Sequence, residues 1–329
     1  MPSGTVFFLS DYGLVDEFVG VVHAVLHRLA ARVVVVDLTH QVPPYDVRAG
    51  AAALARAVPY LGPGVVLAVV DPGVGGPRRG LAVALADAGP DGAGLDGAGP
   101  DGGRPGSRWL VGPDNGLLLP AADRAGGIDR VLALDRAAVD RAVADRLVTG
   151  HIGTGRPGTD RPGAGGATVA ATFDGRDLFG PAAALLVAGV DPETLGDPVS
   201  AAQLVRVPDP VVELGTLGDG RRLVRTEVTW VDRFGNAQLG ADGDTVPPSV
   251  PVVTVTVATT TPGSTTTPAV QEAGPVPEEI RRVRTFSDLA AGQPGLLSDG
   301  NGRLALAVRE GSAAARFGVA PGDLVELVW

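Results

Sequence analysis

Short apolar runs alternate with helix-like segments over residues 5–70, and this alternation limits the folds open to the chain. From Phe18 to Leu29 the apolar side chains recur at the spacing of one helical face, and residues 48–57 form a second helical segment. The apolar runs typical of buried strands are residues 5–10, 33–38 and 64–70. Strands that alternate with helices predict an α/β fold, with a three-layer N-terminal domain built on a mostly parallel sheet.

The pattern changes after about residue 205, where strand-like segments follow one another without helices. These segments are residues 222–231, 250–259, 303–308 and 324–329. They predict a smaller all-β domain, so we place the α/β domain at residues 1–200 and the all-β domain at residues 201–329. Two Gly/Ala/Asp/Pro-rich stretches and one Thr/Pro-rich stretch are expected to be flexible surface insertions and a long loop: residues 86–107, 150–167 and 260–277.

Composition narrows the chemistry that the chain can perform. The chain has 329 residues, no cysteine and a net charge of −10, and all 27 of its basic residues are arginine. Without cysteine or lysine there is no thiolate nucleophile, no cysteine-bound metal, no Schiff base and no P-loop. The acidic balance argues against a nucleic-acid partner. Because no apolar window is long enough for a membrane span and no secretory signal is visible, we expect a cytoplasmic protein without membrane contact.

Two short runs place carboxylates and arginines on Gly-rich backbone. The first, residues 71–79, follows directly on the third apolar run and contains Asp71 and Arg78, and the second is residues 172–177. In α/β proteins the loops at strand ends carry the functional side chains, so we expect these charges to meet a polar ligand. The alternative is a pair of surface turns whose charges are solvated.

The histidines and the acidic residues after the first strand are further candidates. His23 and His27 lie four residues apart on one helix but lack a third ligand, so we interpret them as ordinary helix-surface residues. His40 is expected to hydrogen-bond loop backbone, and the alternative is a catalytic role. Asp11 and Asp16 could hold a ribose diol or an ammonium group, although Asp16 could instead cap the helix.

Six blocks, in order along nearly the whole chain, carry a family resemblance. They are Ser10-Asp11-Tyr12-Gly13, Thr39-His40-Gln41-Val42-Pro43-Pro44-Tyr45-Asp46-Val47, Val70-Asp71-Pro72-Gly73-Val74-Gly75, Gly112-Pro113-Asp114-Asn115-Gly116-Leu117, Phe173-Asp174-Gly175-Arg176-Asp177 and Asp232-Arg233-Phe234-Gly235-Asn236. Together they resemble the S-adenosyl-L-methionine (SAM) hydrolases, or SAM hydroxide adenosyltransferases, which are relatives of the fluorinase and chlorinase. Any single block would be a weak signal, whereas six in order make a strong one.

The resemblance implies a β-barrel-like C-terminal domain and a homotrimer that binds SAM between one subunit's N-terminal domain and a neighbour's C-terminal domain. It implies no cofactor and no metal. The substrate contacts that it implies are Asp11 on the ribose hydroxyls, Tyr45 on the sugar, Asp16 and Asp232 on the methionine ammonium, Phe234 and Phe286 on the faces of adenine, Asn236 on the adenine edge, and Phe173 as a further substrate-lining residue.

The water-activating residues match the family only in part. The hydrolases carry an Asp-Arg-His triad, of which Asp71 and Arg78 stand at the first two positions and Asp174 replaces the histidine. Asp174 either accepts a proton in the histidine's place or satisfies backbone N–H groups of its own turn. The family's contact near the methionine carboxylate is altered to Gly300-Asn301-Gly302. The resemblance implies hydrolysis of SAM to adenosine and methionine; the alternatives are a SAM-dependent halogenase and a non-catalytic SAM- or adenosine-binding protein.

Overall fold

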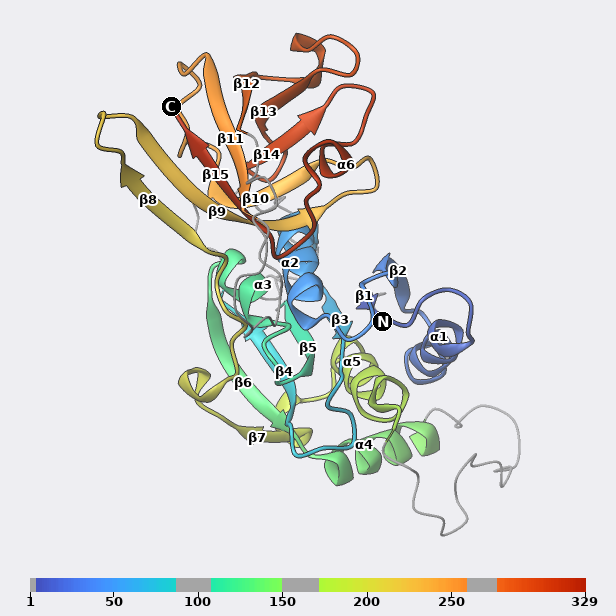
Figure 1. Cartoon of the computed structure of the whole chain (residues 1–329). Coiled ribbons are helices and arrows are strands. Elements are labelled where there is room, and N and C mark those ends of the chain that lie inside the picture. The colour runs from blue at the N-terminus through green and yellow to red at the C-terminus, as the bar shows by residue number, and fades with distance from the viewer. Residues whose placement is uncertain (1–3, 87–107, 150–171, 259–276) are drawn as a thin grey trace, which may run out of the picture. The chain divides into compact units, whose positions relative to one another are not determined.

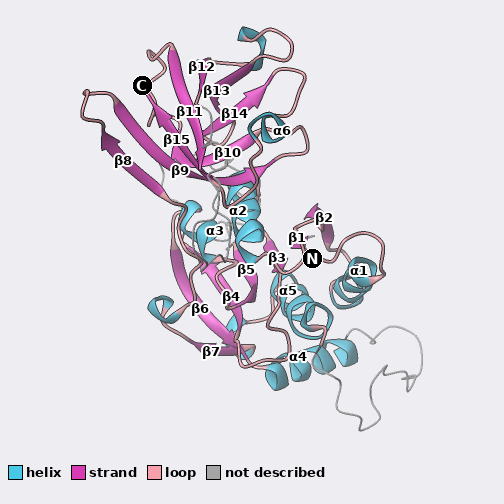
Figure 2. Ribbon diagram, in the orientation of Figure 1, coloured by secondary structure: helices cyan, strands magenta, loops and turns pink. Residues whose placement is uncertain are grey.

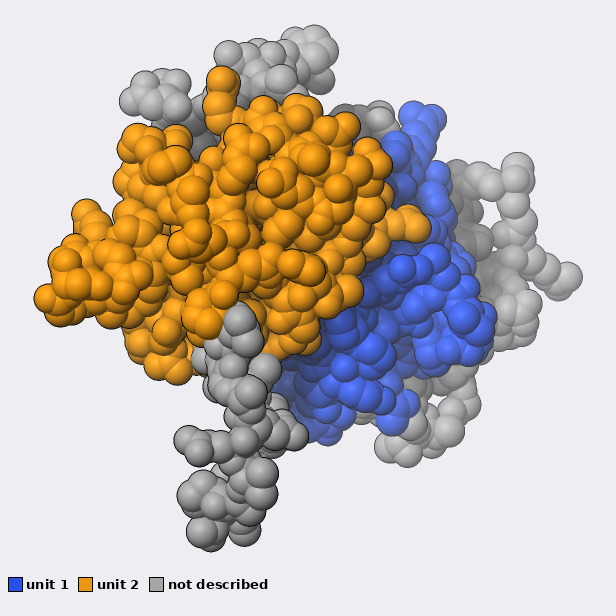
Figure 3. Space-filling view, turned by 45° about the horizontal axis from the view of Figure 1, so that its top comes forward, with its two compact units in different colours: residues 1–207 blue, residues 208–329 orange. Residues whose placement is uncertain are grey.

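The computed structural model describes residues 4–86, 108–149, 172–258 and 277–329. The chain divides into two compact units, Met1–Val207 (unit 1) and Pro208–Trp329 (unit 2), which Figure 3 draws in separate colours. The boundary predicted from the sequence falls between residues 200 and 201. Apart from Ala86 and Pro277, the three predicted insertions lie outside the described residues. Within the described ranges, no helix is long and apolar enough to cross a membrane.

Unit 1 is built on a seven-stranded sheet with the order β2-β1-β3-β5-β4-β6-β7 (Figure 1). Its strands are β1 (Thr5–Ser10), β2 (Val34–Thr39), β3 (Val65–Val69), β4 (Gly80–Leu85), β5 (Trp109–Pro113), β6 (Ile128–Leu134) and β7 (Gly196–Pro198). β2, β1, β3 and β5 are parallel neighbours, whereas β4, β6 and β7 each pair antiparallel with their neighbours. The part of the sheet formed by the predicted N-terminal strands is therefore parallel.

Helices cover both faces of this sheet, so unit 1 has three layers (Figure 2). The helices are α1 (Phe18–Leu29), α2 (Val47–Ala57), α3 (Leu119–Arg124), α4 (Arg136–Thr149) and α5 (Gly180–Val187). Side chains alternate along β3: Leu67 and Val69 pack into the core shared with α1 and α5, and Val66 and Ala68 into the core shared with α2 and α3. The predicted α/β class and its three layers are confirmed.

The elements predicted over residues 5–70 are all present, with ends that shift by no more than one residue. The expectation of a buried strand at residues 33–38 is wrong, because Val34 is 51% and Val36 39% exposed. β2 lies at the edge of the described sheet, where it has one strand neighbour. The alternative in which Asp16 caps the first helix is also wrong, since Glu17 is at the N-cap of α1 and no side-chain hydrogen bond caps it.

Unit 2 is a closed β-barrel. Its strands are β8 (Val212–Thr216), β9 (Arg222–Val231), β10 (Ala237–Asp242), β11 (Val252–Ala258), β12 (Glu278–Arg282), β13 (Pro294–Ser298), β14 (Arg303–Val308) and β15 (Leu324–Val328). They follow the order β10-β14-β13-β12-β11-β15-β9-β8, and the pairing of β10 with β9 closes seven of them into the barrel. Side chains such as Val224, Leu239 and Leu306 fill its core. The predicted all-β domain is confirmed, with the short helix α6 (Ala313–Phe317) as an addition.

Candidate active site

Four polar residues follow the ends of adjacent parallel strands of unit 1. Asp11 follows β1, His40 follows β2, Asp71 comes just after β3 and Asp114 follows β5. Because these strands are parallel neighbours, the four residues lie side by side at the carboxyl ends of the strands, along one edge of the sheet. β2 and β3 lie on opposite sides of β1, so the strand order reverses here, and Asp11 and Asp71 flank this switch point. Open α/β sheets bind their ligands at such a point.

The structure brings Asp71, Arg78 and Asp174 together in one charged cluster. Arg78 Nε donates to both carboxylate oxygens of Asp71 at 3.0 Å. Arg78 Nη2 donates to Asp71 Oδ2 and, at 2.5 Å, to Asp174 Oδ2. A fourth residue, Arg136, donates through its Nη2 to Asp174 Oδ1. The cluster therefore pairs two carboxylates with two guanidinium groups, and the side chains of Asp174 and Asp71 are only 3% and 6% exposed.

Local backbone geometry brings these side chains into position. Arg78 lies at the end of the loop between β3 and β4, where Gly75 has a φ of +77°, a conformation that favours glycine. Asp174 precedes a π-helical turn, Gly175–Phe179, that continues into α5, and such turns occur frequently at functional sites. Asp174 makes no side-chain hydrogen bond to this turn, so the alternative in which it satisfies its own backbone is wrong. Its two oxygens accept from the two arginines instead.

Arg78 remains a cation in this environment. Burial alone would lower the pKa of Arg78, but the hydrogen bonds to Asp71 and Asp174 and their charges raise it above its ordinary value. A guanidinium group can orient a water molecule, but it cannot accept a proton. Within the cluster, only the carboxylates of Asp71 and Asp174 can serve as proton acceptors.

Tyr12 lies beside the cluster. A Cβ atom added to Gly175 would lie 2.0 Å from the Tyr12 hydroxyl oxygen, so glycine at this position leaves room for the phenol. Burial, followed by the negative charges of Asp11, Asp71 and Asp174, raises the pKa of Tyr12. The hydroxyl group is therefore protonated at working pH and able to donate a hydrogen bond.

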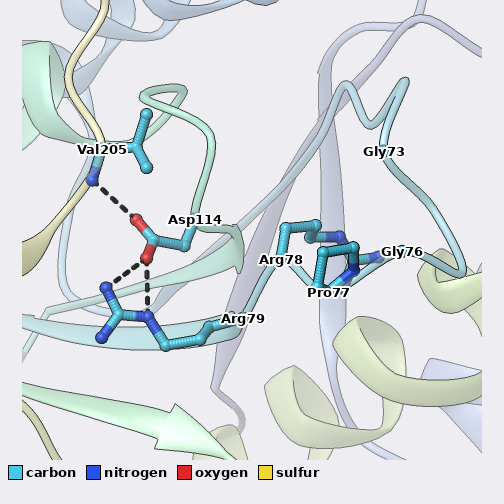
Figure 4. A pocket seen from close by; sticks show the side chains of 7 residues that line it. All are labelled: Gly73, Gly76, Pro77, Arg78, Arg79, Asp114 and Val205. Atoms are coloured by element: carbon cyan, nitrogen blue, oxygen red, sulfur yellow. Dashed lines mark hydrogen bonds and ion pairs between the residues drawn. The ribbon is translucent and has the colours of Figure 1, made fainter.

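A pocket of about 430 Å³ lies against the loop that carries Arg78 (Figure 4). It is lined by Gly73, Gly76, Pro77, Arg78, Arg79, Asp114 and Val205. The buried carboxylate of Asp114 accepts from Arg79 Nε at 2.8 Å and from Val205 N at 3.0 Å. Asn115 Nδ2 donates to Val70 O at 2.8 Å. The block at residues 112–117 therefore holds the loop after β3 in place.

Asp11 joins the end of β1 to the loop after β2. Its Oδ2 accepts from Tyr45 N at 2.9 Å. Tyr45 has a φ of +67° and a side chain that is largely exposed. A residue other than glycine keeps this backbone conformation only where its surroundings fix it, and such residues gather at ligand sites. The hydrogen bond that Tyr45 N donates to Asp11 thus places Tyr45 beside the switch point.

The histidines differ from the expectations drawn from the sequence. The His40 ring bonds a side chain rather than loop backbone, since its Nδ1 lies 2.8 Å from Ser10 Oγ. Its Nε2 lies 3.0 Å, and His23 Nε2 2.8 Å, from Asp37 Oδ1. His23 is therefore paired, unlike the plain surface residue that we expected, whereas His27 is exposed. The three ligand atoms of His23, Asp37 and His40 lie within 4.8 Å of one another, close enough for a metal ion, but the Asp–His contacts already account for the arrangement.

The remaining predicted residues of unit 1 surround the same edge of the sheet. Phe173 contacts Tyr12 and Phe18 in edge-to-face arrangements, with ring centroids 5.5 and 5.2 Å apart. Phe173 is half-buried, whereas Asp16 is exposed. Phe173 therefore connects the turn that carries Asp174 to the start of α1.

In unit 2, Asp232 organises the turn between β9 and β10. Its carboxylate accepts from Phe234 N at 2.8 Å, Asn236 N at 2.9 Å and Asn236 Nδ2 at 2.8 Å. Phe234 is largely exposed, and Phe286, at the start of a short helical turn after β12, is half-exposed. Both aromatic rings thus remain accessible within this unit.

One residue of the cluster and one beside it were not predicted from the sequence. Tyr12 stands in the first block, next to Asp11, and this position was its only signal. Arg136 begins α4 immediately after β6, and no spacing or motif connects it with Asp174. Only the fold brings each of them to the turn that carries Asp174.

A charged cluster at the switch point of a parallel sheet, beside a pocket, is typical of an α/β enzyme, here joined to a β-barrel unit. The chain belongs to the SAM hydroxide adenosyltransferase family. The model of the family's N-terminal domain matches residues 6–91 and 104–196, and that of its C-terminal domain matches residues 226–326. The resemblance found in the six blocks is therefore confirmed.

Individual relatives match nearly the whole chain. A protein from Salinispora tropica, named (R)-S-adenosyl-L-methionine hydrolase, is 41% identical over 98% of this chain and 97% of its own length. A protein of the same name from Thermus thermophilus is 35% identical over 98% of this chain and 99% of its own. The crystal structure of an uncharacterized conserved protein from Thermotoga maritima has a TM-score of 0.70 and 27% identity, covering 98% of this chain and 99% of that one.

Proposed function

We propose that this protein hydrolyses SAM to adenosine and L-methionine. The observation that carries the proposal is the cluster of Asp71, Arg78 and Asp174 at the switch point, in a chain that matches both domains of the family. Support also comes from full-length relatives that are named SAM hydrolases. Two buried carboxylates are poor neighbours for a halide ion, so the cluster favours water over halide as the nucleophile.

In the proposed reaction, a water oxygen forms a bond to C5′ of the ribose while the C5′–S bond breaks. The bonding pair goes to sulfur, so the sulfonium becomes the neutral thioether of methionine. The water becomes the 5′-hydroxyl of adenosine and gives one proton to Asp71 or Asp174, which releases it to solvent. Because the leaving group is neutral, the main task is to hold water in line with the C5′–S bond, an effect of up to about 7–11 kcal/mol in ideal cases. Arg78 orients that water.

In the proposed complex, unit 1 holds the sugar. One oxygen of Asp11 binds Tyr45 N, which leaves the carboxylate able to accept from the ribose hydroxyls, and the Tyr45 ring packs on the sugar. Phe173, whose ring contacts that of Tyr12, is a further substrate-lining residue. Asp16, which is exposed near the switch point, meets the methionine ammonium.

Unit 2 supplies the adenine contacts in this proposal. The exposed rings of Phe234 and Phe286 stack on the faces of the purine, and Asn236 bonds its edge. Asp232 accepts three hydrogen bonds from its own turn, so it holds Phe234 and Asn236 in place in addition to meeting the ammonium group.

We further propose a cytoplasmic homotrimer that works without cofactor or metal. The absence of cysteine fits a reducing compartment. Leu14, Val15 and Phe18, next to the candidate site, expose apolar surface that a second subunit could cover. A neutral leaving group needs no Lewis acid to depart.

Incubation of the pure protein with SAM, with and without chloride, tests the proposal by mass analysis of the products. We expect adenosine and methionine in both cases, with one ¹⁸O atom in the adenosine when the reaction runs in labelled water. 5′-Chloro-5′-deoxyadenosine as the main product would instead make the protein a halogenase. Binding of SAM without any turnover would make it a binding protein.

The same assay after treatment with a chelator tests the metal-free part. We expect the rate to stay unchanged, both after chelation and on addition of zinc. The variant His23→Ala, which dismantles the group of possible ligands around Asp37, should likewise keep its rate. Loss of activity on chelation that zinc restores would contradict this part of the proposal.

A further inference from the structure

Arg136 is the one cluster member that neither the motifs nor the family triad accounts for. It is the first residue of α4, directly after β6, and its guanidinium reaches Asp174 on the far side from Arg78, contacting the other carboxylate oxygen. Its side chain is 40% exposed, whereas that of Asp174 is 3% exposed. Arg136 therefore approaches a buried carboxylate from the solvent side.

Charge explains why Asp174 has this second partner. With a neutral histidine at position 174, Asp71 and Arg78 would balance each other. Aspartate at this position adds a negative charge in a buried site, which is unfavourable unless it is paired. Arg136 restores the balance, and each oxygen of Asp174 then accepts a charge-assisted hydrogen bond from a different arginine.

From this we infer that Arg136 is a positioning residue, which acts through Asp174 and leaves Asp71 as the proton acceptor. Proton uptake by Asp174 would break ion pairs with two cations from two elements, whereas proton uptake by Asp71 would break the ion pair with one. Asp71 pairs with Arg78 alone among the described contacts. Asp174 thus anchors Arg78, and Arg136 anchors Asp174. This inference rests on the proposed hydrolysis of SAM.

The inference predicts that the importance of Arg136 depends on the residue at position 174. In the wild type, loss of Arg136 leaves a buried carboxylate with one partner and shifts Arg78. With histidine at position 174, Arg136 has no carboxylate to bind and its loss should be harmless. An arginine that only stabilised α4, without acting through Asp174, would matter equally in both backgrounds.

A mutant cycle on the full-length protein tests this. We expect Arg136→Gln to lower kcat by up to about 10²-fold, the effect of a small misplacement, with KM little changed. In the Asp174→His background the same change should alter kcat by no more than a few-fold. Arg136→Lys should recover most of the rate, because Arg136 uses a single nitrogen on Asp174. Arg141→Gln, which removes the same charge from an exposed position on α4, is the matched control and should behave as wild type.

The pH profile separates the two carboxylates. We expect Asp174→Asn to keep the acidic limb of the kcat profile, because Asp71 still accepts the proton, and Asp71→Asn to lose it. An equal effect of Arg136→Gln in both backgrounds, or loss of the acidic limb in Asp174→Asn, would overturn the inference.

Failure of the proposed function would look different, since the wild type itself would then make no adenosine. In that case the positioning role is rejected as well. Urea unfolding of the wild type, Arg136→Gln, Asp174→His and the double variant then shows whether Arg136 and Asp174 stabilise the fold as a pair. Coupled free energies of unfolding would leave Arg136 and Asp174 as a structural pair. Additive free energies of unfolding would show that Arg136 and Asp174 do not stabilise each other either.

Discussion

Gly175, in the turn that follows Asp174, leaves room for the phenol of Tyr12. Replacing this glycine is a direct test of how the site is packed. We expect Gly175→Ala to lower the free energy of unfolding by about 1–3 kcal/mol and to reduce kcat, because the new methyl group meets the phenol oxygen. Tyr12→Phe removes that oxygen and should recover part of the loss. Urea unfolding and steady-state kinetics measure both effects.

The matched control for this change is Gly20→Ala on α1. A Cβ atom there would meet nothing within 4 Å, so alanine should stabilise the helix by up to about 1 kcal/mol. If Gly175→Ala were as harmless as Gly20→Ala, Tyr12 would not pack against the turn as the structure has it.

At the scale of single residues, the sequence predicted those that lie within recognisable loops. Asp11 and Asp71 follow strand ends, and the parallel arrangement of β1 and β3 is enough to place them at one edge; Arg78 lies in the loop that Asp71 begins. The partners of Asp174 could not be predicted in this way. Arg136 and Arg78 reach it over separations of 38 and 96 residues, which depend on the packing of α4 and of the turn before α5.

At the scale of elements, Asp37 connects β2 to α1 through His23, and this link should depend on pH. Burial alone would raise the pKa of Asp37, but its contacts with the His40 and His23 rings outweigh burial and lower the pKa below its ordinary value. A lowered pKa in the folded state means stability that is present above the unfolded pKa, about 3.9, and lost as the pH falls through the folded value.

Asp37→Asn should therefore lower the urea midpoint modestly at pH 7, and the difference from wild type should shrink as the pH falls below about 3.9. The effect is modest because Asp37 is partly exposed and solvent screens the pair. His27→Ala, on the same helix but exposed, should show no such pH dependence. A difference that stays constant from pH 7 to pH 3 would count against this role of Asp37.

Element type and position followed from periodicity alone, but the environment of an element did not. Residues 33–38 have the apolar run of a buried strand, yet strand order places β2 at an edge. Likewise, no local pattern shows that β4, β6 and β7 enter the sheet antiparallel. Strand order depends on long-range pairing, which a window of sequence does not contain.

At the scale of the whole molecule, each unit has its own hydrophobic core. Unit 1 packs two cores, one on either face of its sheet, and unit 2 has the barrel core. The change from alternating strands and helices to strands alone predicted this division, because each pattern can bury its apolar side chains only in its own architecture.

The proposed site takes residues from both units, and if two subunits share it, two inactive variants should repair each other. Asp71→Asn disables the unit 1 side and Asn236→Ala the unit 2 side. Co-expressed in equal amounts, they should form mixed oligomers in which about a quarter of the sites join two intact halves, by random assortment around the ring. We expect clear recovery of adenosine formation over either variant alone, together with a trimer in light scattering. Activity no higher than the sum of the separate variants would place each site within one subunit, and a fully active monomer would reject the trimer.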